Sequence, residues 1–302
     1  MTTDASSTHL EAEIATQPQD WLRADALARE HAGLLPQPGE RVAVIGCGTS
    51  LYMAQAFAEL RERAGQGLTD AWPASEHRLD RGYDRILAIT RSGTTTEVVT
   101  VLEEWNGKIP STVITATPST PVVDLADEIV TPDLDEQSVV QTRFATGTLA
   151  LLRSHLGEDL TAAAEQAQQV LDADEASLGP ATTAEELTFL GRGWTNGLAN
   201  EAALKLRESA QLWTESYPMM EYRHGPLSIS SAGRVVWAFG EPVSNLAADV
   251  RATGAHFESS TVDPMADLLR VHRLCVVRAH AAGLNPDTPR NLTRSIILAD
   301  PS

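Results

Sequence analysis

Two turns in the first half of the chain combine glycines with hydroxyl side chains directly after short apolar runs. Residues 46–50 read Gly-Cys-Gly-Thr-Ser, and five of the seven residues at 90–96 are serine or threonine. Backbone N–H groups at a helix start, joined by several hydroxyl donors, form a neutral cradle for a phosphomonoester dianion. Ordinary N-capping needs only one serine or threonine per helix, so the hydroxyl density at 90–96 favours a phosphate site.

The stretch 200–208, Asn-Glu-Ala-Ala-Leu-Lys-Leu-Arg-Glu, is the second candidate for chemistry. At about 100° per residue in a helix, Glu201, Lys205 and Glu208 share one face. The same spacing is that of a surface glutamate–lysine pair worth about a few tenths of a kcal/mol, and spacing alone favours this simpler interpretation. His224 follows in an Arg-His-Gly-Pro loop, where a solvent-exposed role and a catalytic role both stay open.

The elements that must position these residues alternate in type along the first half of the chain. Short β-branched runs predict four strands, at 41–45, 85–89, 111–115 and 128–131. Helical segments separate them, which is typical of a parallel sheet with helices on both faces. An amphipathic helix at 10–34 precedes the first strand, and Pro18 predicts a break in it.

The second half repeats this alternation more weakly. Strand-like runs lie at 187–190, 234–239, 256–260 and 273–277. A Gly-x-Gly turn at 191–197 and a long helix at 198–212 follow the first of these, as in the first half. The segment 154–186, rich in Ala, Gln, Asp and Glu, is interpreted as a helical connector. The pattern predicts a duplicated α/β domain.

Composition restricts the class of partner. The chain has 302 residues, of which 42% are hydrophobic, and can therefore fill two cores of ordinary size. Its net charge of −18 repels nucleic acid and anionic membranes. No run approaches the roughly 18 apolar residues of a membrane span, and no basic and apolar leader opens the chain. We therefore expect no nucleic acid, no membrane and a cytoplasmic location.

Cysteine and lysine are both scarce. Cys47 and Cys275 lie far apart in apolar, strand-like runs, as reduced and buried cysteines usually do. Lys108 and Lys205 are the only two lysines among 23 basic residues. Any lysine chemistry therefore has just two candidates, and Lys108 sits in a Trp-Asn-Gly-Lys turn typical of a solvated residue.

Five motifs together resemble those of a known family. They are Gly46–Ser50, Thr90–Thr95, Glu201–Glu208, Arg223–Pro226 and Pro289–Ser295. In this order and at these separations they resemble the motifs of tandem sugar isomerase (SIS) domain proteins. The resemblance is to the isomerase half of glucosamine-6-phosphate synthases and to related amino-sugar-phosphate isomerases and deaminases, and it covers roughly residues 35 to 295.

The resemblance implies a role for each motif. The 90–95 turn would bind phosphate, and Glu208 would be the general base that moves a proton between C1 and C2. His224 would assist ring opening from the neighbouring subunit of a homodimer, and Lys205 would place positive charge beside the developing enediolate or enolamine. No metal or other cofactor is expected. The implied substrate- and phosphate-binding residues are Thr49, Ser50, Thr90, Arg91, Ser92, Gly93, Thr95, Gln141 and Glu201.

Two positions depart from the family pattern. Arg294 stands where the family commonly has a lysine, which in the synthases is associated with a Schiff base to the keto sugar. A guanidinium stays protonated and cannot be a nucleophile, so only Lys205 would be well placed to form an imine. Gln141 stands where the synthases have serine, within a second sugar-contacting segment at 136–144, and could retune the substrate. The catalytic candidates are Glu208, His224, Lys205 and Arg294.

The expected activity follows from what the resemblance covers. The synthases begin with a glutaminase domain whose nucleophile is an N-terminal cysteine, whereas Thr2 follows Met1 here. We therefore expect an amino-sugar-6-phosphate deaminase or isomerase that converts glucosamine-6-phosphate to fructose-6-phosphate and ammonia. One alternative is a fructosamine-6-phosphate deglycase, in which Gln141 or Arg143 contacts the amine substituent. Another is a non-catalytic phosphosugar-binding regulator, although no basic DNA-binding segment is present.

The expected architecture is α/β with two SIS domains, each a mostly parallel sheet flanked by helices on both faces. One sugar site per subunit is expected, because the strand at 234–239 leads into Gly240–Ser244 rather than a hydroxyl-dense loop. The expected divisions are an N-terminal helical segment (1–34), a phosphosugar-binding domain (35–155), a helical connector (156–186), a domain with the glutamate and histidine (187–285) and a C-terminal tail that contributes to the site (286–302).

Overall fold

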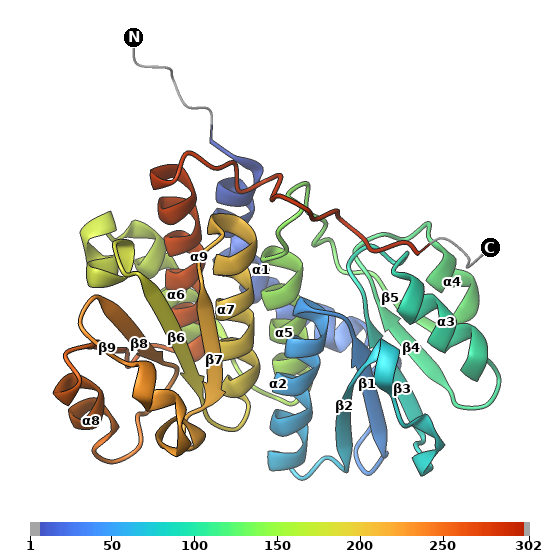
Figure 1. Ribbon diagram of the computed structural model, residues 1–302. Helices are drawn as coiled ribbons and strands as arrows, with labels where there is room; N and C mark the ends of the chain where they lie inside the picture. The colour runs from blue at the N-terminus through green and yellow to red at the C-terminus, as the bar shows by residue number, and fades with distance from the viewer. Residues whose placement is uncertain (1–6, 299–302) are drawn as a thin grey trace.

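Two separate parallel sheets form the frame of the molecule. The structure is a computed structural model and describes residues 7–298. The first sheet has the strand order β2-β1-β3-β4-β5 and the second β7-β6-β8-β9, and all neighbouring strands are parallel. The predicted α/β class with two parallel sheets is therefore confirmed. In Figure 1 the first sheet lies on the right and the second on the left.

The strands of the first sheet are β1 (Val42–Gly46), β2 (Thr69–Pro73), β3 (Arg85–Ile89), β4 (Ser111–Ile114) and β5 (Glu128–Val130). Those of the second sheet are β6 (Glu186–Gly191), β7 (Thr214–Pro218), β8 (Arg234–Ala238) and β9 (His256–Ser259). The α-helices are α1 (His9–Glu30), α2 (Thr49–Arg63), α3 (Thr96–Trp105), α4 (Pro121–Leu125), α5 (Arg143–His155), α6 (Thr161–Asp172), α7 (Thr195–Ala210), α8 (Leu246–Ala252) and α9 (Pro264–Ala281).

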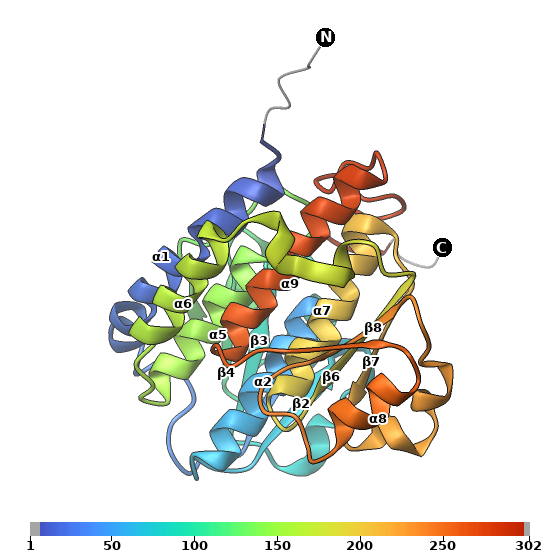
Figure 2. The ribbon, with the colours of Figure 1, turned by 90° about the vertical axis from the view of Figure 1, so that its left-hand side faces the viewer.

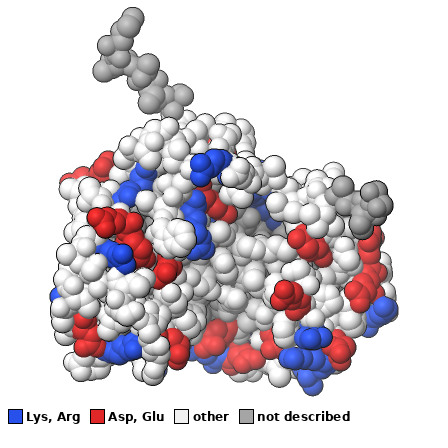
Figure 3. All heavy atoms as spheres, viewed as in Figure 1, with Lys and Arg blue, Asp and Glu red and all other residues white. Residues whose placement is uncertain are grey.

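Helices cover both faces of each sheet. Helices α3 and α4 pack on the outer face of the first sheet, and α8 packs on the outer face of the second. Helix α1 packs against α5, α6 and α9, as the view turned by 90° shows (Figure 2). Acidic and basic side chains are interspersed over the face seen in Figure 3.

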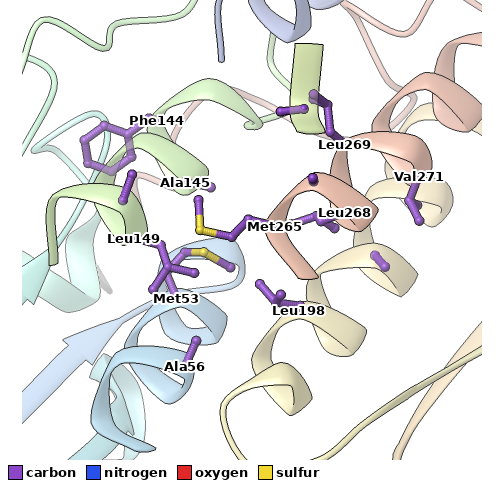
Figure 4. Close-up of a cluster of buried hydrophobic side chains, with 14 of the residues drawn as sticks. Met53, Ala56, Phe144, Ala145, Leu149, Leu198, Met265, Leu268, Leu269 and Val271 are labelled. Carbon is purple, nitrogen blue, oxygen red and sulfur yellow. The ribbon is translucent and has the colours of Figure 1, made fainter. Parts of the chain in front are cut away.

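The main hydrophobic core lies between the two sheets. Side chains of α2, α5, α7 and α9 meet there, among them Met53, Leu149, Leu198 and Met265, all fully buried (Figure 4). This core fixes α2 against α7, so that the start of α2, which follows β1, faces the middle of α7. Two motifs that are far apart in the sequence are thereby brought to one place.

The predicted strand at 273–277 is wrong, because these residues lie inside α9. The helix passes between α1, α6 and α7, and it buries Leu268, Val271, Leu274 and Cys275. The four consecutive apolar residues at 274–277 hide the helical period and give this part of the helix the sequence pattern of a strand. Cys275 is therefore buried as predicted, but on a helix.

The predicted break at Pro18 is also wrong. Helix α1 is 22 residues long and continues through Pro18. A proline inside a helix removes one backbone N–H, but burial of Leu10, Ile14 and Trp21 against the neighbouring helices holds α1 together. The helical segment predicted at 154–186 contains α6, which packs against α1 and α9.

Candidate active site

The carboxyl ends of β1 and β3 open into a cavity of about 190 Å³, at the edge where open parallel sheets bind ligands. Helix α7 of the second half and the C-terminal segment at 292–296 complete its wall. That segment crosses from the end of α9 to the first sheet (Figure 1). Ten predicted site residues line the cavity: Thr49, Ser50, Thr90, Arg91, Ser92, Thr95, Gln141, Lys205, Glu208 and Arg294.

The hydroxyls of the turn after β3 converge on one point. Ser92 Oγ and Thr94 Oγ1 donate to Ser295 Oγ at 3.1 and 2.9 Å, and Thr95 Oγ1 lies 3.5 Å from the same atom. A single tail hydroxyl thus gathers three hydroxyls of the loop. This is the arrangement of donors that binds the oxygens of an anion.

Gly93, which was predicted to contact substrate, shapes this loop and is not among the residues that line the cavity. Its φ of +64° lies in the left-handed region, and an added Cβ would lie 2.0 Å from Oγ1 of Thr120. Neither the conformation nor the space admits a side chain.

Arg91 ties three segments of the site together. Its side chain is 4% exposed, and its guanidinium lies 3.4 Å from the fully buried carboxylate of Glu136. It also donates to the carbonyls of Ser138, Val139 and Arg294 at 3.0 to 3.2 Å. The turn after β3, the 136–141 loop and the tail are therefore held by one buried cation.

Arg294 fixes the tail from the other side. Its guanidinium donates to the carbonyl of Glu136 and pairs with the carboxylate of Asp135. The residue lines the cavity, but these two partners hold its charge toward the 135–136 loop. Its position is that of a tail anchor.

Glu201, Lys205 and Glu208 do share one face of α7, and the interpretation as a surface pair is wrong. The Lys205 side chain is 1% exposed, and its Nζ lies 2.5 Å from Oε2 of Glu208 and 3.6 Å from Oε1 of Glu201. The side chain of Glu201 is fully buried behind the lysine, whereas that of Glu208 is 19% exposed. The Thr49 hydroxyl, from the turn after β1, donates to Glu201 at 3.2 Å and links the two halves.

Burial and mutual charge set the protonation of this group. Burial raises the pKa of Glu201 to about 7, against the opposing effect of Lys205. Burial by itself lowers the pKa of Lys205, but the two carboxylates outweigh it and the net shift is upward. Lys205 is therefore an ammonium at neutral pH. An amine must lose its proton before it can form an imine, so the pairing opposes a Schiff base on Lys205.

His224 lies on the surface and does not line the cavity of its own chain. Its short 3-10 turn, Glu221–His224, is held by the buried ring of Tyr222 and by an ion pair of 2.6 Å between Arg223 and Asp249. The backbone of the loop is thus anchored while the imidazole is exposed.

Gln141 and Arg143 have different positions. Gln141 lines the cavity, and its amide nitrogen is buried without a hydrogen-bond partner. Arg143 instead pairs with Asp20 of α1 at 2.7 Å and is not among the lining residues. Cys47 also lines the cavity, and burial raises the pKa of its thiol to about 11, so that it stays protonated.

Two residues central to this geometry were missed by sequence reasoning. Glu136 organises the loop under Arg91, and Ser295 meets the hydroxyls of the phosphate turn. Both lie within segments that the sequence had already marked, but only the fold shows that these segments meet. Between residues 7 and 298 no three His, Cys, Asp or Glu side chains are grouped to hold a metal, and no helix has the length and apolar character to cross a membrane.

The chain is similar in sequence or fold to several proteins that are named as phosphosugar enzymes. No family model matches the chain. It is 25% identical to a glutamine–fructose-6-phosphate aminotransferase (isomerizing) of Methanothermobacter thermautotrophicus, over 88% of this chain and 53% of that protein. It is 28% identical to the corresponding protein of Sulfolobus acidocaldarius, over 85% and 50%. The chain spans about half the length of these curated relatives.

Solved structures show the same fold. The C-terminal domain of a glucosamine-fructose-6-phosphate aminotransferase of Francisella tularensis matches with a TM-score of 0.80 and 19% identity, over 96% of this chain and 100% of that one. A tagatose-6-phosphate ketose/aldose isomerase of Escherichia coli matches with 0.80 and 19%, over 99% of both. A glucosamine-6-phosphate deaminase of Thermotoga maritima matches with 0.76 and 22%, over 96% and 100%. The chain therefore has the fold of these phosphosugar enzymes.

Proposed function

We propose that the chain is a phosphosugar isomerase of the sugar isomerase type, and specifically an amino-sugar-6-phosphate deaminase. One observation carries the proposal. One cavity of about 190 Å³ is bordered by hydroxyl donors from the first sheet and by the buried Lys205 with its partner Glu208 from α7. The first set fits a phosphate, and the second fits proton transfer at a neighbouring carbon.

Phosphate would bind where the loop hydroxyls now meet Ser295. A dianion accepts hydrogen bonds more strongly than a hydroxyl, so it would replace Ser295 as the acceptor for Ser92, Thr94 and Thr95. Such a local cradle is needed because the net charge of −18 opposes the approach of an anion. The tail would then cover the phosphate, and Arg91 and Arg294 would keep the tail attached to the loops beside it.

Proton transfer would fall to Glu208, which is the more exposed of the two carboxylates beside Lys205. In the open-chain amino sugar, Glu208 removes the proton from C2 and returns a proton to C1. This gives an imine at C2, and addition of water then releases ammonia and leaves the ketone of fructose-6-phosphate. Lys205 stabilises the negative charge that develops in the intermediate.

His224 would act in the site of a neighbouring subunit, because it is exposed and does not line the cavity of its own chain. A mixed-dimer experiment tests this. Glu208→Gln and His224→Ala chains are each nearly inactive, but a heterodimer has one intact site if the histidine comes from the partner. An equal mixture should regain about one quarter of wild-type activity, whereas no recovery after subunit exchange contradicts the shared site.

Deglycation of a fructosamine-6-phosphate is the second candidate, and Gln141 is the observation that favours it. The side chain lines the cavity, and its amide nitrogen has no partner. An amine substituent that carries a carboxylate would provide an acceptor for such a donor. The predicted products are then a sugar phosphate and a free amine.

A substrate panel separates these activities. Purified protein is given glucosamine-6-phosphate, fructose-6-phosphate and a fructosyl-amino-acid 6-phosphate, with binding followed by thermal shift and products by ammonia and sugar-phosphate assays. Ammonia together with fructose-6-phosphate from the first compound supports the deaminase. Turnover of the third compound alone selects the deglycase, and tight binding without any turnover contradicts both enzymes.

A further inference from the structure

A further cavity, of about 370 Å³, lies beside the candidate active site. It shares two lining residues, Glu208 and Leu292, with the cavity of about 190 Å³ described above. We call the smaller space the inner cavity and the larger one the outer cavity. Lys205 lines the inner cavity but not the outer one. The carboxylate of Glu208, the proposed general base, therefore borders both spaces, and the two cavities are neighbours at its side chain.

Three leucines give the outer cavity an apolar wall. Leu204 precedes Glu208 by four residues on α7, so the two side chains are neighbours on the helix surface. Its Cδ2 would lie 3.9 Å from a Cβ added to Gly48, a residue that lines the inner cavity, which again places the two spaces side by side. Leu212 and Leu292 line the same outer cavity. The space beyond Glu208 therefore suits an aliphatic chain.

Two guanidinium groups also border the outer cavity, those of Arg207 on α7 and Arg290 in the tail. Both residues are exposed, and in the part of the chain that the structure describes neither forms an ion pair with a carboxylate. Arg207 uses Nη1 to donate to the carbonyl of Thr214 at 3.0 Å. A guanidinium has five N–H donors, so both side chains keep donors for an anion. Of the described residues that line this cavity, Glu208 alone is acidic, and it is already paired with the buried lysine.

The direction of a bound sugar follows from the proposed function, on which this inference rests. The phosphate on C6 lies at the hydroxyl loop, and C1 and C2, with the nitrogen, lie at Glu208. A group attached to that nitrogen therefore continues away from the phosphate, past Glu208 and into the outer cavity. Free ammonia is about as large as a water molecule, about 30 Å³, and does not need the 370 Å³ found there.

We propose that the outer cavity is the subsite for the substituent of an N-substituted amino-sugar 6-phosphate, and that this substituent is an aliphatic chain ending in a carboxylate. Leu204 and Leu212 contact the chain. Arg207 and Arg290 bind the carboxylate through charge-assisted hydrogen bonds. Gln141 lines the inner cavity but not the outer one, so its amide meets a group close to the nitrogen.

Three ligands that cannot react test this subsite in the wild-type protein. They are 1-amino-1-deoxyhexitol 6-phosphates, which lack the carbonyl group and are therefore not turned over, and their nitrogen carries hydrogen, propyl or 3-carboxypropyl. Calorimetry gives the Kd of each compound. We expect the propyl compound to bind about threefold more tightly than the unsubstituted one, because it buries apolar area. The carboxypropyl compound should bind about tenfold more tightly than the propyl compound, through hydrogen bonds between charged groups.

Arginine variants locate the carboxylate. Arg290→Ala should reduce the advantage of the carboxypropyl over the propyl compound, and the double variant Arg207→Ala/Arg290→Ala should abolish it, with the Kd of the unsubstituted compound unchanged. Arg78→Ala is the matched control, because Arg78 is also exposed and lines neither cavity; it should keep the full advantage. If the double variant does not fold, Arg290→Glu, in the exposed part of the tail, should make the carboxypropyl compound bind no more tightly than the propyl compound.

The outcomes separate this subsite from the proposed function. Equal binding of the three compounds to the wild type overturns the subsite and leaves the phosphosugar site standing. An advantage of the carboxylate that persists in the double variant or in Arg290→Glu, or that Arg78→Ala removes as well, overturns the subsite in the same way. If none of the three compounds binds, the phosphosugar site itself is contradicted, and the subsite is overturned together with the proposed function.

Discussion

The turn after β1 and the turn after β6 have the same backbone form and different chemistry. Gly48 and Gly193 both adopt left-handed φ values, +53° and +58°. An added Cβ on Gly46 or Gly191 would lie 2.7 or 2.2 Å from the backbone of the helix that follows. Each strand therefore passes into its helix through a turn that only glycine allows.

The side chains of the two turns serve different purposes. After β1, Thr49 and Ser50 line the 190 Å³ cavity. After β6, the hydroxyl of Thr195 is used within its own turn, where it accepts from the N–H of Arg192 at 2.8 Å. A second cavity of about 910 Å³ lies beside this turn, but Arg192, Trp194 and the loop after β8 border it in place of a hydroxyl cluster. The second half therefore repeats the backbone form of the turn, but it does not repeat the hydroxyl cluster that is predicted to bind phosphate.

We expect the largest loss of activity from a substitution on α7, the helix of the second half that lines the cavity at the first sheet. Glu208→Gln should lower kcat on glucosamine-6-phosphate by about 10² to 10⁴, the usual contribution of a general base. Glu103→Gln, an exposed carboxylate on α3, is the matched control and should leave the rate unchanged. Steady-state ammonia release measures both variants. Equal rates in the two variants would contradict the proposal that Glu208 on α7 is the general base.

The hydroxyl loop should control binding. Ser92→Ala combined with Thr95→Ala removes two donors to a charged group, and we expect KM to rise by about 10- to 100-fold with a smaller change in kcat. Ser244→Ala, in the corresponding loop after β8, is the control and should leave KM unchanged. A similar rise in KM for Ser244→Ala would show that the second cavity also takes part.

The two glycine turns should separate stability from function. Gly46→Ala and Gly191→Ala should each cost about 2 kcal/mol or more, because a methyl group meets backbone atoms in both turns. Urea denaturation measures the loss. Of the two, only Gly46→Ala should also raise KM, since only its turn borders the smaller cavity. Equal effects on KM would mean that the turns share one function.

The smallest effect on activity concerns a buried acid in the second sheet. Burial raises the pKa of Glu186 from its ordinary value of 4.5 to about 7 in the folded protein. The native state therefore binds this proton more tightly than the unfolded chain, and its contribution to stability is lost as pH rises from about 4.5 to about 7. Glu186→Gln should be more stable than wild type by about 3 kcal/mol at pH 8, and this difference should shrink to about 1 kcal/mol or less at pH 5. A constant difference between the two pH values contradicts the assignment.

Sequence reasoning located the interior strands better than the edge strands. β1, β3, β4 and β6 are almost entirely buried and contain runs of β-branched or large apolar residues, which is the pattern that predicts them. The sequence pattern does not predict two of the edge strands, β2 and β7. Both contain polar residues and end in proline, as edge strands often do. Neither shows the alternation of apolar and polar residues that would distinguish a strand from a loop.

The sequence predicts most of the residues that line the site, but only part of how these residues are arranged. Motif spacing placed Lys205 and Glu208 on one helical face, but burial of that face depends on the contact between α2 and α7. The role of Glu136 depends on which loops meet in space, so local sequence carries no signal for it. For the same reason Glu201 was predicted to touch substrate, whereas it lies behind Lys205 and does not line the cavity.

Solvent deuterium incorporation tests the central claim, that α7 transfers a proton on a sugar held by the first sheet. In D₂O, wild-type protein given glucosamine-6-phosphate should form fructose-6-phosphate that carries deuterium at C1, detected by NMR. Glu208→Gln should bind the sugar phosphate with an unchanged Kd and form no deuterated product. Deuterium at C1 at the wild-type rate in Glu208→Gln would contradict the account.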